Sequence, residues 1–422
     1  MALEQVFECS STLAKLQSAP LGKLLDSFCK WSLNHGFSRA TTRLHLGNLS
    51  HVNEYLRCAR SRMRQTVTAG EIEGFFAKYA SRCRNRGPLE GHLLRVRYSV
   101  NRFVEHLREE GHFGAAAATR AIYQPLLDEY LQWMRSYQHA APRTLEVRAH
   151  SLTQFLQSLG QDATPRRLAK LDYERVEQFV LAYASGNGRS ARRSMQSALR
   201  TFLRFALHAR YLRQPLDHAV PMFRTYKLAT VPRGLAEQQA QEVLRKIDRN
   251  TAVGRRDYAI LQLLSTYGVR GGQLRALRLD ELDWARDQIF FKAAKHGKDV
   301  WVPMTLDAGE ALLDYLQHGR PACSCPEVFL TSLAPYHPLP HSSTLSAIVR
   351  CRLRAADIDL PSAGAHAFRY AFATRMLRQG YGLKAIADVL GHRNLSTTFR
   401  YAKVDFSALK QVALEWPQEV SP

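Results

Sequence analysis

The 422-residue sequence predicts a mainly α-helical protein with a small β-hairpin in its last third. Two observations favour helices over residues 1–230: apolar side chains recur at helical spacing, and two stretches share that spacing. A third observation predicts the hairpin, because two short runs of β-branched and aromatic residues flank a polar turn that contains a glycine. We therefore expect helical N-terminal units followed by a mixed α/β domain.

A weak internal repeat predicts that the helical part contains two units of about 100 residues. Residues 24–31 and residues 126–133 both read Leu-Leu-Asp followed by a tryptophan. After each of them comes a helix with apolar side chains at i, i+3, i+4, i+7 and i+8, beginning at Ile72 and at Val176. Such spacing also arises between unrelated helical bundles, so a duplication and a coincidence both remain open.

The repeat and the position of the prolines divide the chain into four parts. A proline-punctuated segment without apolar periodicity, at 215–233, is typical of a basic linker. It separates a helical unit at 120–214 from a C-terminal domain at 234–422, which includes a C-terminal tail. The first copy of the repeat forms an additional N-terminal helical domain at 1–115.

The C-terminal domain is expected to combine helices with one hairpin. Residues 235–247 have an amphipathic pattern and residues 256–268 form a mostly apolar run that ends at a glycine, so both are predicted as helices. Residues 288–292 and 300–302 are predicted as the two strands of the hairpin. The polar turn between them, 295–299, places lysines at the tip.

The composition indicates a polyanionic partner. The chain has 59 Lys and Arg against 37 Asp and Glu, a net charge of +22, and cations that neutralise phosphates release condensed counterions. Nucleic acid is favoured over an anionic membrane surface, and no uninterrupted apolar run reaches the ~18 residues of a membrane span. An N-terminus without an apolar signal core and seven scattered cysteines predict a cytoplasmic protein without a disulfide framework.

The positive charge is concentrated in the helical part of the chain. Residues 1–230 hold 34 Lys and Arg against 18 Asp and Glu, whereas residues 231–422 hold 25 against 19. Arginines beside helix starts and loops, as in the loop at 186–190, can reach phosphates together with backbone N–H groups. The predicted DNA-binding residues are Arg143, Arg189, Arg192, Arg193, Lys227 and Arg233.

Four features of the last third bear on one another. They are an arginine at a helix boundary, a lysine on the hairpin, a histidine and an arginine three residues apart, and a Gly-His pair followed nine residues later by a tyrosine. Each feature alone is common, but their order and spacing together are specific. The candidate catalytic residues are Arg270, Lys295, His366, Arg369, His392 and Tyr401.

With these motifs, residues from about 122 to 412 resemble a tyrosine recombinase of the phage-integrase and Xer type. That family's signature is an Arg, a hairpin Lys, His-x-x-Arg, Gly-His and a nucleophilic Tyr in this order, and the Leu-Ser-Thr-Thr at 395–398 also resembles it. The resemblance implies that the unit at 120–214 is a SAM-like core-binding domain that contacts DNA. It implies a tyrosine-recombinase catalytic domain at 234–422.

The resemblance implies that the phenolic oxygen of Tyr401 attacks the scissile phosphate, leaving a 3′-phosphotyrosyl link and a free 5′-hydroxyl. Arg270 and Arg369 then clamp the nonbridging oxygens, because a planar guanidinium can donate two parallel hydrogen bonds. His366 and His392 donate to the same oxygens or manage the tyrosine proton. This chemistry requires neither a metal nor a nucleotide cofactor.

The leaving 5′-oxygen needs a proton, and the resemblance assigns its donation to Lys295. Lys298 on the same turn and Lys292 in the preceding strand remain alternatives, because a general acid is defined by its reach. The family commonly has an acid three residues after the first arginine, where this chain has Gln273. A glutamine can still hydrogen-bond a guanidinium, but without a charge it holds the cation less strongly.

A zinc site is the one alternative that would add a metal. Cys323 and Cys325 could ligate zinc with His318, His337 and His341 nearby. Their spacing fits no common closed site, so we expect a surface loop and no metal.

The implied function is site-specific DNA recombination, and the additional N-terminal domain favours the integrase or transposase of a mobile element. The alternatives are an Xer-like resolvase of multimers or cointegrates, a type IB topoisomerase, and a catalytically decayed DNA-binding protein. The complete set of six site residues argues against decay. The expected partners are double-stranded DNA, further copies of the chain in a tetramer assembled on DNA, and accessory DNA-bending proteins.

Overall fold

The computed structural model describes most of the chain. The described residues are 2–59, 66–82, 89–114, 121–222, 234–293, 299–360, 363–392, 394 and 398–399. Helices dominate and strands form two small sheets, which confirms the predicted mainly α fold with a small sheet in the last third. Within the described ranges, none of the helices is long and apolar enough to span a membrane.

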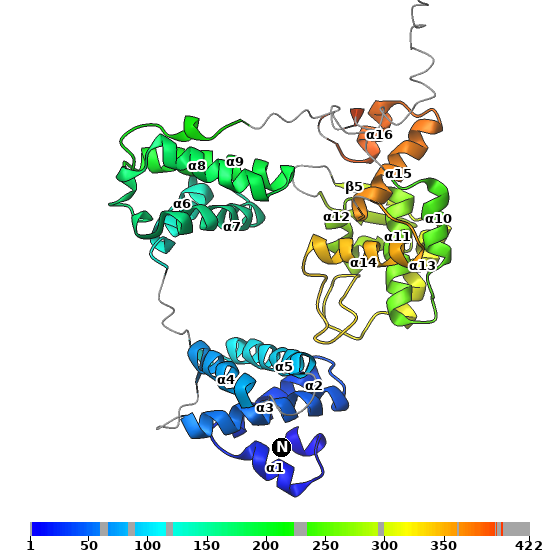
Figure 1. The fold of residues 1–422 in the computed structure, drawn as a ribbon. Coiled ribbons are helices and arrows are strands. Elements are labelled where there is room, and N and C mark those ends of the chain that lie inside the picture. Colours follow the sequence, from blue (N-terminus) through cyan, green and yellow to red (C-terminus); the bar gives the residue numbers. More distant parts are fainter. Residues whose placement is uncertain are drawn as a thin grey trace, which may run out of the picture. The chain divides into compact units, whose positions relative to one another are not determined.

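The protein packs around three main apolar cores. Contacts between residues divide the chain into two compact units, residues 115–227 and residues 1–114 with 228–422. Within the second unit, the residues before 114 and those after 228 each have a core of their own. Figure 1 draws the three parts in blue to cyan, in green, and in yellow-green to orange.

Residues 2–114 form a helical bundle with one short parallel strand pair. The pair joins β1 (Val67–Thr68) to β2 (Phe113–Gly114). The sequence did not predict it, because two residues are too few to show an alternation. The helices are the 3₁₀ turn Ala2–Gln5, α1 (Ser10–Gln17), α2 (Gly22–Asn34), α3 (Arg39–Ala59), α4 (Ala69–Arg82) and α5 (Leu89–Glu109).

Residues 121–222 form a second helical bundle. Its helices are α6 (Gln124–Gln138), α7 (Pro142–Leu159), α8 (Tyr173–Gly186) and α9 (Arg189–His208). Leu216, Ala219 and Val220 belong to its core, so packed structure continues into the segment expected to be a linker. Lys227 and Arg233 lie outside the described residues.

The two bundles share a packing pattern as well as a helix order. In the first, α3 packs on α2 and α5, and in the second, α7 packs on α6 and α9. Phe28 of α2 meets Phe103 of α5 edge to face, with ring centroids 5.4 Å apart. Tyr130 of α6 meets Phe202 of α9 in the same geometry at 5.5 Å. These matching ring pairs support the predicted duplication, which stays a prediction.

Residues 234–399 form the mixed α/β part, built around the buried helix α11. The helices are α10 (Glu237–Arg245), α11 (Ala252–Tyr267), α12 (Gly271–Arg275), α13 (Leu306–His318), α14 (Ser342–Ala355), α15 (Ala365–Arg378) and α16 (Leu383–Val389). α11 packs against both α13 and α15. Its continuous apolar run is explained by this position, because a helix covered on several sides has no solvated stripe.

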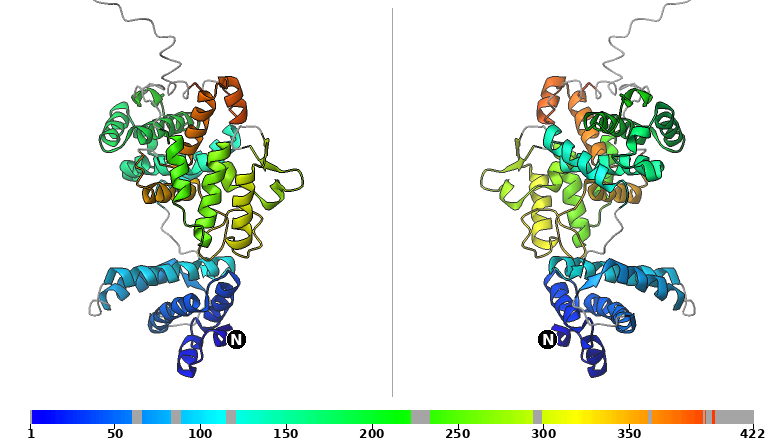
Figure 2. Two further views of the ribbon diagram at one scale, coloured as in Figure 1. Left: turned by 90° about the vertical axis from the view of Figure 1, so that its right-hand side faces the viewer. Right: turned by 90° about the vertical axis from the view of Figure 1, so that its left-hand side faces the viewer.

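The predicted hairpin is confirmed and extended by a third strand. β4 (Gln288–Phe291) pairs antiparallel with β5 (Val300–Pro303), with Phe291 opposite Val300 near the tip. Ile289 and Phe291 point into the core, as the alternation requires. β3 (Leu282–Asp283) adds to the other edge of β4. The sheet lies at the edge of the helices of this part (Figure 2).

Candidate active site

The turn after α11 places Arg270 at a helix boundary, as predicted. Gly268 ends α11 in the left-handed conformation, with φ +58°. A Cβ atom at Gly268 would lie 2.6 Å from the Phe372 ring of α15, so both the backbone and the packing require glycine. The glycine therefore lets the turn that carries Arg270 lie directly against the helix that carries Arg369.

The Gly-His pair caps the C-terminal end of α16. Gly391 has φ 63°, and its N–H donates to the Asp388 carbonyl. The N–H of His392 donates to the Ala387 carbonyl at 2.8 Å, which completes the double hydrogen bond of a Schellman cap. Such a cap leaves carbonyls at the helix end to other donors, here those of the C-cap residue Leu390 and of Gly391 just beyond it.

The two arginines supply those donors. Arg369 donates to the Leu390 carbonyl at 2.7 Å and to the Gly268 carbonyl at 2.8 Å. Arg270 donates to the same Leu390 carbonyl at 3.3 Å and to the Gly391 carbonyl at 3.1 Å. The carbonyl dipoles offset the repulsion between the two cations. The structure thus holds both guanidiniums on one shared oxygen, with Arg369 buried and Arg270 half-buried.

His392 completes this cluster as a neutral imidazole. Its Nε2 accepts a hydrogen bond from Arg369 Nη2 at 2.8 Å, so the ring proton lies on Nδ1, which donates to Thr398 Oγ1 at 2.8 Å. Burial, and then the charges of Arg369 and Arg270, lower the pKa of His392 from 6.5 to about 4. Both ring nitrogens of His392 are thus engaged within the protein, and its catalytic role stays a prediction.

We expect the His392 ring to stay neutral far below the usual range of histidine. Because its pKa is lower in the folded chain than the ordinary 6.5, the ring stabilises the fold above pH 6.5, and this contribution is lost as the pH falls toward 4. Nitrogen-15 NMR of the histidine rings should show the Nδ1–H tautomer of His392 at pH 7 and no protonation at pH 5.5. A midpoint at or above pH 6.5 would contradict the geometry, and His392→Gln assigns the signal.

The two other residues predicted to act near the phosphate are His366 and Tyr401. His366 is exposed on the first turn of α15, three residues before the buried Arg369. Tyr401 lies outside the described residues. Neither role is tested by the geometry, so both remain predictions.

Of the three lysines considered as general acid, the structure describes one. Lys295 and Lys298 lie outside the described residues. Lys292 is described, and its Nζ pairs with a carboxylate oxygen of the buried Glu281 at 2.6 Å. This pair gives the exposed Lys292 a partner on Glu281, and the assignment of Lys295 as general acid stays a prediction.

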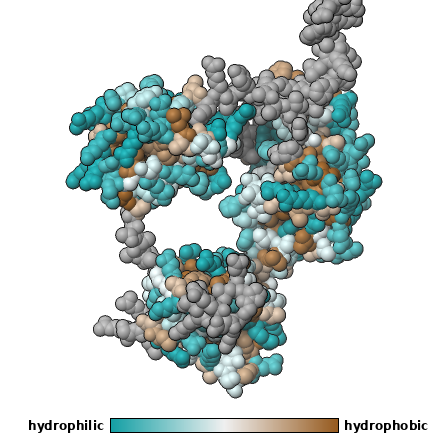
Figure 3. Space-filling model, viewed as in Figure 1, coloured by the Kyte–Doolittle hydropathy of each residue, from teal (hydrophilic) through white to brown (hydrophobic). Residues whose placement is uncertain are grey.

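Three of the expected DNA-binding residues, Arg189, Arg192 and Arg193, lie at the start of α9. Arg189 and Arg193 are exposed there, on a helix whose sequence contains no acidic residue. With Ser190 and Ser194 they line an open hollow of about 460 Å³. Hydrophilic side chains cover most of this bundle on the side seen in Figure 3. The surface suits an extended anion better than an apolar ligand.

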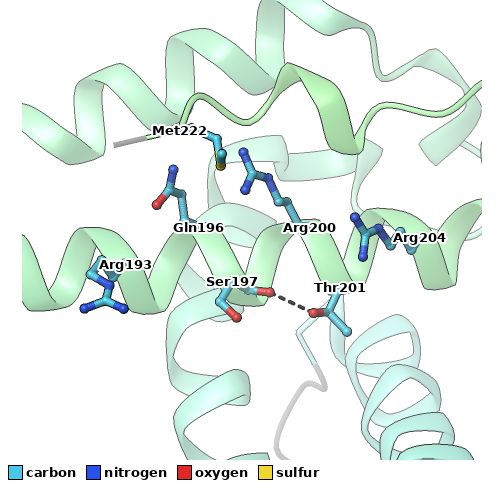
Figure 4. Close-up of a pocket in the computed structure, with 7 residues that line it drawn as sticks. All are labelled: Arg193, Gln196, Ser197, Arg200, Thr201, Arg204 and Met222. Carbon is cyan, nitrogen blue, oxygen red and sulfur yellow. Dashed lines mark hydrogen bonds between the residues drawn. The ribbon is translucent and has the colours of Figure 1, made fainter. Parts of the chain in front are cut away.

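A second hollow continues along the same helix (Figure 4) and adds residues that the sequence analysis missed. Its volume is about 430 Å³. It is lined by Arg193, Gln196, Ser197, Arg200, Thr201, Arg204 and Met222. Arg200 donates to the Val220 carbonyl at 2.5 Å, and Arg204 pairs with Asp217 at 2.8 Å. The signal that could have revealed them is the spacing of Arg193, Arg200 and Arg204, seven and then four residues apart, which places them on one helical face.

Two other expected DNA-binding residues are engaged locally. Arg143 pairs with Glu146 one turn along α7 at 2.7 Å, although both side chains are exposed. Arg192 donates to the Asn187 carbonyl at 2.6 Å and so closes the loop before α9. We name Arg189, Arg193, Arg200 and Arg204 the α9 arginine face.

The cysteine loop carries no recognisable metal site. The Cys323 and Cys325 sulfurs lie 2.7 Å apart, with the Tyr336 carbonyl 3.7 Å from Cys323 Sγ. Across the part of the chain that the structure describes, no three His, Cys, Asp or Glu side chains are grouped to hold an ion.

Comparison with known proteins finds relatives over most of the chain. Residues 233–408 match the Phage integrase family. A Sinorhizobium fredii (strain NGR234) protein with the provisional name integrase/recombinase y4rF is 31% identical over 98% of this chain and 96% of its own length. Tyrosine recombinase XerC of Anoxybacillus flavithermus is 28% identical over 68% of this chain and 95% of its own length.

Solved structures share the fold. A lambda integrase tetramer bound to a Holliday junction superposes with a TM-score of 0.53 at 13% identity, over 72% of this chain and 85% of that chain. XerH recombinase bound to its difH substrate gives 0.50 at 17% identity, over 69% and 84%.

The family match and the relative that covers nearly the whole chain place this protein among enzymes that act on DNA. The chain belongs to the phage integrase family of tyrosine recombinases. It is a site-specific tyrosine recombinase that breaks and rejoins DNA, which confirms the family and the enzyme class predicted from the motifs.

Proposed function

We propose that this recombinase integrates and excises a mobile genetic element, cutting each strand by attack of the Tyr401 phenolic oxygen on the scissile phosphate. The bond between phosphorus and the 5′-oxygen breaks, and a 3′-phosphotyrosyl ester forms. The 5′-hydroxyl of another strand then attacks this ester and releases the tyrosine. The ester conserves the energy of the broken bond, so rejoining needs no nucleotide cofactor.

Arg270 and Arg369 are the proposed clamp on the nonbridging oxygens. The observation that carries this proposal is the Leu390 carbonyl, which accepts from both guanidiniums and so holds them together. A guanidinium has five N–H donors, so binding a few carbonyls does not exhaust its capacity for phosphate. Donors placed before the reaction stabilise developing charge with little reorganisation.

Proton transfer is assigned to the remaining residues. A phenol ordinarily has a pKa near 10, so Tyr401 needs an acceptor for its proton at neutral pH. His366 is the proposed acceptor, because the Nε2 lone pair of His392 already accepts from Arg369 and its Nδ1 carries the ring proton. Lys295 is the proposed general acid for the leaving 5′-oxygen, with Lys298 as the alternative.

The proposed partner is double-stranded DNA in the cytoplasm, held by the α9 arginine face and by Lys227 and Arg233. The lambda integrase structure is a tetramer on a Holliday junction, and we propose the same number of copies for this chain. Accessory DNA-bending proteins are a further proposed partner, because bending a site of 20–30 base pairs costs roughly 1–6 kcal/mol.

Integration is favoured over resolution by the extent of the similarity. The integrase/recombinase of Sinorhizobium fredii matches 98% of this chain, which includes the N-terminal domain, whereas XerC matches only 68%. To test the proposal, a site duplex is first selected from a random-sequence pool with Tyr401→Phe protein. Wild-type protein should then join a circle carrying that site to a second plasmid carrying it. Resolution of two sites on one plasmid without any intermolecular product would favour the resolvase.

The α9 arginine face should contribute measurably to the salt dependence of binding. Each phosphate contact makes the slope of log K against log salt more negative by about 0.9, so Arg189→Gln with Arg193→Gln should make the slope less steep by roughly 2. Titration of the site duplex between about 50 and 200 mM salt measures it. Arg166→Gln with Arg167→Gln, exposed on the loop before α8, removes the same charge and is the control. If the salt slope changes equally in the two double variants, the loss of net charge alone explains the change. The α9 arginine face would then make no direct contact with phosphate.

A further inference from the structure

We infer that Gln273 is a positioning residue that holds the outgoing end of β4 against the Arg270 turn and so places the hairpin lysine for protonation of the leaving 5′-oxygen. This inference rests on the proposed role of that lysine. It concerns the position at which this chain departs from the acid common in the family.

Gln273 uses both ends of its side-chain amide. Its Oε1 accepts from the backbone N–H of Arg270 at 3.2 Å, and its Nε2 donates to the backbone carbonyl of Lys292 at 2.9 Å. The side chain is 9% exposed, so water competes little for either bond. One buried amide therefore connects the turn that carries the first arginine to the strand end that leads into the hairpin tip.

A carboxylate could make only one of these two bonds. It would accept from the Arg270 N–H, but it has no proton to donate to the Lys292 carbonyl. Two acceptor oxygens would then face each other in a buried site, which costs free energy in proportion to their desolvation. In this chain the glutamine amide therefore satisfies both backbone partners, which a carboxylate does not.

The other hydrogen bonds of the β4–β5 hairpin lie at its base and across its turn. At the base of the hairpin, the Tyr267 hydroxyl donates to the Pro303 carbonyl at 2.8 Å and accepts from the Thr305 N–H at 3.1 Å. Toward the tip, the Ala293 N–H donates to Asp299 Oδ1 at 2.6 Å, which joins the two sides of the turn to each other. Of these hydrogen bonds, the one from Gln273 ties the tip side of β4 to the arginine turn.

Loss of the Gln273 hydrogen bond is expected to affect one step, the protonation of the leaving 5′-oxygen. When the bond between phosphorus and the 5′-oxygen breaks, the electron pair stays on that oxygen, which takes a proton from the lysine ammonium. Protonation requires a donor within about 3 Å, and a displacement of about 1 Å can cost roughly 100-fold in rate. Loss of the Gln273 bond should therefore slow departure of the 5′-oxygen while the arginine clamp remains.

Two substrates separate this role from a merely structural one. Single-turnover cleavage is measured with a nicked site duplex that has either oxygen or sulfur as the 5′-bridging atom. A thiol has a pKa near 8.5 and leaves without a proton, so a sulfur substrate does not need the general acid. Gln273→Glu should be slowed roughly 10- to 100-fold on oxygen and less than about 3-fold on sulfur. Its defect on oxygen should lessen as the pH falls, because a protonated glutamate can again donate.

A second substitution at Gln273 and one at Lys295 serve as controls. Gln273→Met loses both hydrogen bonds without adding charge and should also be rescued by sulfur. If Gln273→Glu and Gln273→Met are slowed equally on both substrates, the inference is overturned. Lys295→Ala tests the proposed general acid separately: failure of sulfur to rescue it would reject that lysine. Sulfur rescue of the Gln273 variants in that case would still support positioning of a hairpin acid.

Discussion

Replacing Arg369 by lysine is expected to slow strand cleavage by about 100-fold or more while site binding stays within a few-fold of wild type. In the structure one planar guanidinium reaches the carbonyls of Gly268 and Leu390 and the Nε2 of His392. An ammonium is a point charge and cannot reproduce that fork. Loss of one preorganised donor to developing charge typically costs 10²–10³ in rate.

The comparison requires cleavage and binding to be measured on the same duplex. Single-turnover cleavage of the nicked site duplex gives the rate, and salt-matched titration gives the affinity. Arg378→Lys is the control, because Arg378 is exposed at the end of the same helix. Equal losses of binding and cleavage in Arg369→Lys would mean that Arg369 contributes to affinity and not to the transition state.

Replacing Asp257 by asparagine is expected to destabilise the C-terminal part by about 3–5 kcal/mol. Asp257 is 3% exposed and pairs with Arg256 at 2.7 Å and with Arg352 of α14 at 2.7 Å. Removing its charge leaves the buried Arg256 without its counterion, which costs far more than loss of a surface pair. The pair between Asp257 and Arg352 also joins α11 to α14, so both helices should lose protection.

Native-state hydrogen exchange of peptides from α11 and α14 in the full chain measures this effect. Asp314→Asn is the matched control, because Asp314 also pairs with two arginines, Arg249 and Arg255, but is partly exposed. Its cost should be about 0–1 kcal/mol per pair. Equal costs in the two variants would contradict the importance of burial.

The parts of the fold with local signals were predictable from the sequence. The glycine after α11 and the alternation in β4 determine local backbone geometry, and both elements lie where the sequence placed them. Strands β1, β2 and β3 are two residues long, and their pairing depends on distant partners. No local pattern could have revealed them.

The candidate site also has a part that could be predicted from the sequence and a part that could not. The order of Arg270, Arg369 and His392 in the sequence indicates the family, and the structure brings the three residues together. The shared acceptor is a backbone carbonyl of Leu390, and a carbonyl has no identity in a sequence. The link from Gln273 to the Lys292 carbonyl was missed for the same reason.

The most direct test of the account is the covalent link itself. Wild-type protein is incubated with the nicked site duplex, and the trapped adduct is digested and analysed by mass spectrometry. We predict a peptide in which Tyr401 carries a 3′-phosphate of the cleaved strand, and no adduct from Tyr401→Phe protein. An adduct on another residue, a 5′-phosphate linkage, or cleavage by the phenylalanine variant would contradict the account.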